Sequence, residues 1–191
     1  MNKKVIDGIK YRKLPFNRTS VYSKYSSREQ KNIADCSRRI KAHPDNSNPY
    51  FQRGRIYINT GDYAKAKEDF IKCIELNKAS SASSYFYLGL AYKMSEEHEL
   101  AVQNFDHAIR LEGNNFNTYY HRGESHLSLY NLTNSSEEQH ILLDKALADF
   151  DKAISLNPEH FESRQQRKNA IIILSSDLIW DILQPDGPRE N

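Results

Sequence analysis

Three stretches of the sequence carry one pattern and decide the fold: Tyr50-Phe51-Gln52-Arg53-Gly54-Arg55-Ile56-Tyr57, Tyr85-Phe86-Tyr87-Leu88-Gly89-Leu90-Ala91-Tyr92 and Tyr119-Tyr120-His121-Arg122-Gly123-Glu124-Ser125-His126. Their glycines are 35 and 34 residues apart. A period of this length is typical of stacked repeats, in which each unit buries its apolar face against its neighbours. The sequence therefore predicts an array of similar units.

A second pattern follows each of these glycines. Sixteen residues after the first two come Phe70 and Phe105, each with a small residue four positions before it and three after it, and Phe150 closes the third copy in the same way. Apolar spacing of three and four residues forms one buried face of a helix. We expect the small residues to lie where the two helices of a unit approach closely, and the large rings to fill the gaps between units.

Together the two patterns resemble the tetratricopeptide-repeat family, whose signature runs from an aromatic residue through Gly, aromatic, Ala, Phe and Ala to Pro over two antiparallel helices. The resemblance covers about residues 26–160. It implies an all-α fold, a right-handed α-solenoid of antiparallel helix pairs that ends in a C-terminal capping helix.

The predicted organisation places a half unit before three full units. Its parts are a basic extended arm (1–25), a half unit (26–46), three units (47–81, 82–115 and 116–159), a capping helix (160–183) and a tail (184–191). The half unit is read from residues 32–46, which look like a second helix without its first. The capping segment is expected to be one long helix or two short ones, with Trp180 either completing the cap or marking a partner or dimer contact.

The third unit departs from the period. Gly123 and Phe150 are 27 residues apart, against 16 elsewhere, which is an insertion of eleven residues at about 130–140. We expect an enlarged turn there, with Ser136 opening a capping box that restarts the helix. In the first unit, Asp62 is expected to cap the second helix or to act as its first-turn acid.

Composition excludes several classes of protein. The chain has 191 residues, 38% of them hydrophobic, and no run approaches the ~18 apolar residues that a membrane span requires. Two cysteines, Cys36 and Cys73, are too few for a disulfide scaffold and point to a reducing compartment. We find no catalytic motif, metal-ligand set or cofactor motif, and His121 and His126 are poorly spaced for one metal. The prediction is a non-enzyme without metal or cofactor, in the cytoplasm, with a cytoskeletal or ciliary setting as the alternative.

Charge is unevenly distributed. Residues 1–42 carry twelve Lys/Arg and three acidic residues, a net +9, whereas the remaining residues carry −7. The first part would attract an acidic surface, and the second would repel a nucleic-acid backbone.

By resemblance, the first helices of successive units line a concave groove that binds a protein segment. The predicted groove residues are Phe51, Arg55, Ile58, Phe86, Leu90, Met94, Tyr120, Glu124 and Leu127. Their mixture suits an extended peptide or an amphipathic helix with apolar anchors. Two alternatives stay open: the aromatic residues pack on neighbouring units, or the groove is filled by the chain's own arm.

One subfamily holds the C-terminal carboxylate of heat-shock chaperones, using a Lys and an Asn in the first unit, an Asn in the second, and a Lys and an Arg in the third. The matching positions here are Phe51, Arg55, Tyr87, Asn117 and His121. Because a carboxylate clamp needs fixed cations and amide donors at those positions, we do not expect this protein to be such a chaperone binder.

The arm interleaves bases with aromatic residues. Its predicted contact residues are Lys10, Tyr11, Arg12, Lys13, Arg18, Tyr22, Lys24 and Tyr25. A solvated tail, a docking arm for an acidic protein surface and a nucleic-acid contact are its three interpretations, the last disfavoured by the acidic body. The predicted function is a protein-binding adaptor or scaffold, and the alternative is a structural component of a cytoskeletal or ciliary assembly docked through the arm.

Overall fold

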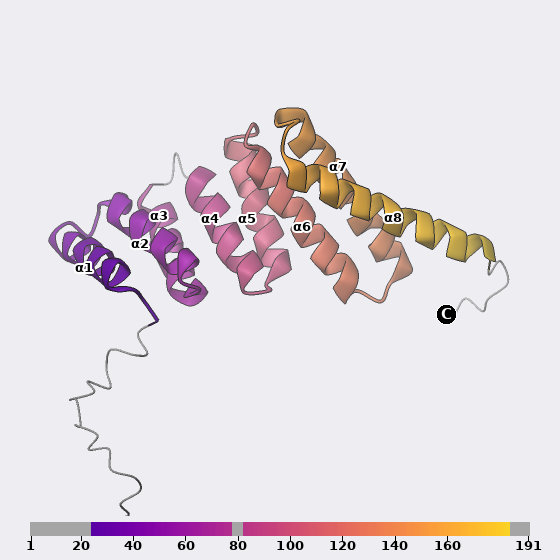
Figure 1. Cartoon of the computed structure of the whole chain (residues 1–191). Helices are drawn as coiled ribbons and strands as arrows, with labels where there is room; N and C mark the ends of the chain where they lie inside the picture. Colours follow the sequence, from indigo (N-terminus) through magenta and orange to yellow (C-terminus); the bar gives the residue numbers. More distant parts are fainter. Residues whose placement is uncertain (1–23, 78–81, 184–191) are drawn as a thin grey trace, which may run out of the picture.

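The computed structural model describes residues 24–77 and 82–183, with side chains up to residue 175. The described part is all helical: α1 (Ser27–Ala42), α2 (Ser47–Asn59), α3 (Tyr63–Leu76), α4 (Ala82–Met94), α5 (His98–Leu111), α6 (Phe116–Leu132), α7 (Ser136–Leu156) and α8 (Phe161–Leu183). Consecutive helices pack side by side and build an elongated array (Figure 1). The predicted all-α solenoid is confirmed. None of the described helices is both long and apolar enough to cross a bilayer.

Each unit is held by a ring packed over a glycine. A Cβ atom added at Gly54, Gly89 or Gly123 would lie only 2.8–2.9 Å from a ring carbon of the phenylalanine sixteen or more residues later. Phe70, Phe105 and Phe150 are fully buried there. The close approach that the sequence predicts between the two helices of each unit is therefore present.

Ion pairs between a half-buried arginine and a buried aspartate connect the two helices of the first and third units. Arg53 donates from Nε and Nη2 to the Asp69 carboxylate at 2.9 and 2.8 Å, and Arg122 holds Asp149 in the same bidentate way. The second unit has Leu88 and Asn104 at these positions. Its packing therefore rests on apolar contacts alone at this point.

The insertion in the third unit lengthens both helices and leaves the turn unchanged, so the expected enlarged turn is wrong. Whereas α2 and α4 have 13 residues and α3 and α5 have 14, α6 has 17 and α7 has 21. The connection is residues 133–135, as short as the turns of the other two units. Helix α7 begins one residue earlier than expected, because Ser135, not Ser136, accepts the Glu138 N–H.

The half unit at the start is the single helix α1, which begins earlier than residue 32. Ser26 and Glu29 form a capping box: the Ser26 side chain accepts the Glu29 N–H, and the Glu29 carboxylate accepts the Ser26 N–H at 2.8 Å. The capping box therefore starts the helix before residues 32–46, from which the helix was predicted.

Asp62 occupies the N-cap position of α3, as expected, but its side chain makes no capping hydrogen bond. Its carboxylate instead accepts the Tyr25 hydroxyl at 2.5 Å and the Lys65 ammonium at 2.9 Å, and Lys24 lies 3.7 Å away. The hydrogen bond from Tyr25, then that from Lys65, lowers the pKa of Asp62 to about 2. The end of the predicted arm is thus fastened to the α2–α3 turn.

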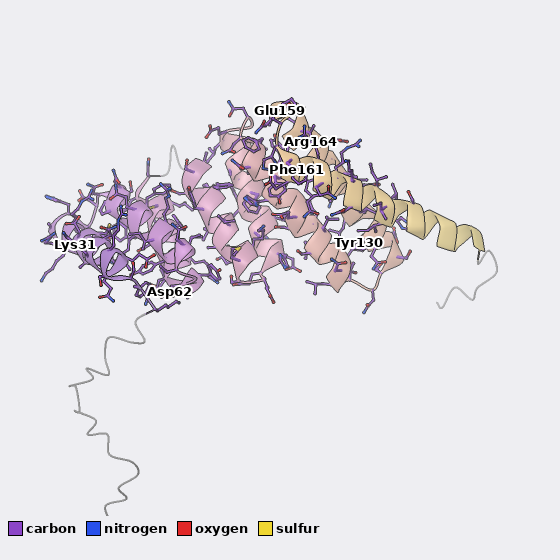
Figure 2. The ribbon with its side chains drawn as sticks, viewed as in Figure 1. Lys31, Asp62, Tyr130, Glu159, Phe161 and Arg164 are labelled. Atoms are coloured by element: carbon purple, nitrogen blue, oxygen red, sulfur yellow. The ribbon has the colours of Figure 1, made fainter. Side chains whose placement is uncertain are left out.

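Helix α8 is one continuous helix that docks on α7 as the first helix of a further unit would. Ser163 and Ala170 are fully buried, and Arg167 contacts Asp151 as Arg122 contacts Asp106 one unit earlier. Phe161 (labelled in Figure 2) and Ile172 are 64% and 63% exposed, so α8 covers α7 with one face and leaves another open. Trp180 lies outside the described side chains.

Candidate protein-binding groove

The first helices of the units form the inner side of the array. Contacts run from α2 to α4, from α4 to α6 and from α6 to α8, whereas α3, α5 and α7 do not contact one another within the described residues. Helices that also touch across units lie closer together than those that do not, so α2, α4, α6 and α8 line the inner side. We call this inner side the concave face.

The predicted aromatic residues are half-buried and pack between units. The ring centroid of Phe51 lies 5.4 Å from that of Tyr87, and Phe86 lies 5.9 Å from His121. Tyr120 lies 5.0 Å from His160, at the junction with α8. These contacts agree with the alternative in which the aromatic residues pack on neighbouring units. A role of the three rings in binding a partner stays a prediction.

The predicted residues on the rest of the face differ in exposure. Arg55 is exposed, with its guanidinium carbon 5.3 Å from the Tyr87 ring centroid, and Met94 is 47% exposed. Ile58, Leu90 and Leu127 are half-buried. Among these predicted residues, the exposed apolar side chain is that of Met94, the last residue of α4.

The structure brings three predicted residues, Met94, Glu124 and Leu127, together in one cavity of about 790 Å³ between α4, α6 and α8. The lining residues are Lys93, Met94, Glu96, His98, Glu124, Leu127, Ser128, Asn131, Leu132 and Gln166. A smaller cavity of about 320 Å³ between α1 and α2 includes Arg55. The remaining predicted groove residues line neither of these cavities.

A closed polar network lies at the edge of the larger cavity. Glu124 accepts the Tyr120 hydroxyl at 2.9 Å and the Lys93 ammonium at 2.5 Å, and His121 Nδ1 lies 2.9 Å from the same carboxylate. Burial alone would raise the pKa of Glu124, but the hydrogen bonds with His121 and Lys93 outweigh it and lower that pKa to about 2. The carboxylate is thus ionised at neutral pH, and it neutralises Lys93.

Sequence reasoning missed the pairing of Lys93 with Glu124. Both residues lie on first helices of successive units, and their separation of 31 residues is three less than the 34-residue spacing of Gly89 and Gly123. Opposite charges at this spacing could have identified the pair. The spacing that brings two side chains together, however, depends on how far one first helix is rotated relative to the next, and the sequence does not give that rotation.

Of the predicted arm contacts, only Lys24 and Tyr25 are described, and both contact the chain's own α2–α3 turn. The Lys24 ammonium donates to the Gly61 carbonyl at 3.3 Å, beside the bond from Tyr25 to Asp62. Lys10, Tyr11, Arg12, Lys13, Arg18 and Tyr22 lie outside the described residues.

The tetratricopeptide-repeat family model matches residues 47–80 and 82–115. The human mitochondrial import receptor subunit TOM70 is 28% identical over 139 residues, covering 71% of this chain and 21% of that protein. The chain thus spans about a fifth of the length of the TOM70 proteins that it matches.

Solved structures share the fold. A crystal structure of MamA superposes with a TM-score of 0.62 at 22% identity, covering 86% of this chain and 88% of that one. The first such domain of Spaghetti (RPAP3), bound to the HSP90 peptide SRMEEVD, gives a TM-score of 0.60 at 18% identity over 68% of this chain and 93% of that one. Residues 47–80 and 82–115 are thus tetratricopeptide repeats, and the glycine–phenylalanine packing of these two units continues in the third unit.

Proposed function

We propose that this protein is a non-enzymatic adaptor or scaffold that binds a peptide or helix of a partner protein on its concave face. The observation that carries the proposal is the cavity between α4, α6 and α8, where Met94 and Leu132 are 47% and 68% exposed. Exposed apolar side chains around a concavity are typical of sites that bind another protein.

The chemistry of the two cysteines supports a binding role over a catalytic one. Both thiols are buried. Burial raises the pKa of Cys36 and raises that of Cys73 to about 12, so neither forms the thiolate that a nucleophile requires at neutral pH.

The charges of the site support a partner other than an acidic C-terminus. Lys93 is neutralised by Glu124, and the positions where a carboxylate clamp has its cations and amides hold other residues. Cytoplasmic location stays a prediction. A structural role in a cytoskeletal or ciliary assembly also stays a prediction.

The test compares proteins captured from a cell extract by three versions of the tagged chain. The concave variant carries Arg55→Glu and Met94→Glu, and the control carries Leu100→Glu and Leu111→Glu on α5, where these leucines are 39% and 51% exposed. We expect partners to be lost with the concave variant and retained with the control, as measured by quantitative mass spectrometry. Equal recovery by all three, with unchanged helical circular dichroism, would contradict the proposal.

A further inference from the structure

The larger cavity owes part of its wall to the insertion in the third unit. Asn131 and Leu132 line it, and they belong to the four residues by which α6 exceeds the length of α2 and α4. The α6 residues on the wall, Glu124, Leu127, Ser128 and Asn131, follow the spacing of one helix face. The insertion therefore extends the concave face of α6 and creates apolar surface that the shorter helices lack.

The apolar surface of the cavity comes from two helices. Met94 ends α4 and Leu132 ends α6, and both are exposed, while the half-buried Leu127 lies on the same wall. A volume of about 790 Å³ exceeds that of one large side chain. The cavity thus has room for an anchor residue together with part of the segment that presents it.

The charge of the lining favours one kind of segment. Lys93 is the only Lys or Arg among the ten lining residues, and its ammonium is 2.5 Å from the Glu124 carboxylate. Glu96 is exposed and forms no ion pair with the described residues. The lining therefore presents a net negative charge and no unpaired cation.

We propose that this cavity binds a large apolar side chain presented by a basic protein segment, and that the insertion supplies part of the apolar wall that holds this side chain. The inference rests on the proposed function, because it assigns the chemistry of a partner to the same concave face. Acidic segments are excluded, since they would meet Glu96 and find Lys93 already neutralised.

The experiment selects a random twelve-residue peptide library, displayed on phage, against the immobilised full chain. Affinities of the enriched peptides are then measured by fluorescence anisotropy for the wild type, for a cavity variant (Met94→Ala with Leu132→Ala), for Arg55→Glu and for the α5 control (Leu100→Ala with Leu111→Ala). Glu96→Lys tests the charge preference separately, and the peptide SRMEEVD serves as the acidic comparison.

We expect enriched peptides to combine a large apolar residue with a net positive charge. Their affinity should fall about ten- to hundredfold in the cavity variant, as loss of one buried apolar anchor implies. It should fall less in Glu96→Lys and stay unchanged in the control. SRMEEVD should not bind measurably.

Five results would overturn the inference. Enrichment of acidic peptides, or binding of SRMEEVD, would contradict the charge argument. Peptides that lose affinity with Arg55→Glu but not in the cavity variant would leave concave-face binding intact and refute the cavity assignment. Peptides that are insensitive to every concave substitution, or no enrichment at all, would count against the proposed function as well.

Discussion

Gly54, Gly89 and Gly123 matter for the space they leave, since a larger residue would collide with a phenylalanine ring that has nowhere to move. At Gly89 a Cβ atom would lie 2.8 Å from Phe105 Cε1 and 3.2 Å from the Ala101 carbonyl oxygen. One contact is with a fully buried ring and the other with backbone, so relief requires the two helices to separate.

We therefore expect Gly89→Ala to lower the free energy of unfolding by about 1–3 kcal/mol, even though alanine favours helices. Urea unfolding followed by circular dichroism measures the change. Gly113→Ala is the matched control, because a Cβ atom there would lie no closer than 3.4 Å to any neighbour. An equal effect of the two substitutions would show that the close helix contact is not what the glycine serves.

His126 makes stability depend on pH. Its ring is 7% exposed, with Nε2 3.7 Å from the Asp149 carboxylate, and burial, followed by the charges of Arg122 and Lys145, lowers its pKa to about 4 from an ordinary value near 6.5. Between about pH 4 and pH 6.5, the ring is neutral in the folded protein and protonated in the unfolded chain. Stability is therefore fully present above pH 6.5 and is lost as the pH falls toward 4, by at most about 1.4 kcal/mol per pH unit.

The measurement is the free energy of unfolding at pH 7 and pH 5, for the wild type and for His126→Gln. We expect the wild type to lose stability between these values and the variant to lose less. Burial also lowers the pKa of His121, so some dependence should remain in the variant. A pH dependence that is the same in both proteins would assign the effect to other groups.

At the scale of the helices, the α6–α7 pair is the element in which this protein departs from a regular repeat. Replacing residues 129–142 by a three-residue Ser-Glu-Glu turn would restore first and second helices of 13 and 14 residues. We expect the shortened chain to unfold cooperatively, because Gly123, Phe150 and the Arg122–Asp149 pair remain. It should lose binding of the selected peptides, because Asn131 and Leu132 leave the cavity wall.

Thermal unfolding and fluorescence anisotropy measure the two parts of this prediction. Undiminished peptide affinity in a folded, shortened chain would refute a binding role for the insertion. A chain that no longer folds would show that the longer helices serve stability, and the point variants of the cavity would then decide the binding question.

The sequence allows the units to be predicted but not the form of the insertion. The contact of Gly54 with Phe70 could be predicted because the same spacing of a glycine and a phenylalanine recurs in the second unit. The contact depends on a small and a large residue at fixed positions. Asn131, Thr133 and Asn134 have the composition of a loop, yet α6 continues through Leu132 because the extended α7 lies beside it. The extra residues of α6 and α7 have no counterpart in the other units, so the repeat pattern of the sequence could not predict their contact.

The candidate site, like the fold, could be predicted only in part. Met94, Glu124 and Leu127 could be placed on the concave face from the repeat register together with the resemblance to the tetratricopeptide-repeat family. The Lys93–Glu124 pair and the contribution of Leu132 could not, because both depend on the rotation between successive first helices and on the length of α6.

For the whole molecule, the relevant contact is that of α8 with α7, the second helix of the third unit. In stacked repeats the terminal unit needs a more polar outer face, because an uncovered apolar face promotes association. Removing residues 159–191 would uncover the face of α7 on which Ser163 and Ala170 pack. We expect the truncated protein to have a lower Tm and to self-associate, as measured by size-exclusion chromatography with light scattering. A monomer of unchanged Tm would show that α8 is not a cap.

Hydrogen–deuterium exchange of the full chain, with and without a selected peptide, tests the central claim most directly. Binding on the concave face predicts added protection in the first helices, above all in residues 82–94 of α4 and 116–132 of α6, with little change in α3 and α5. Protection confined to the second helices, or absent from α4 and α6 at saturating peptide, would contradict it.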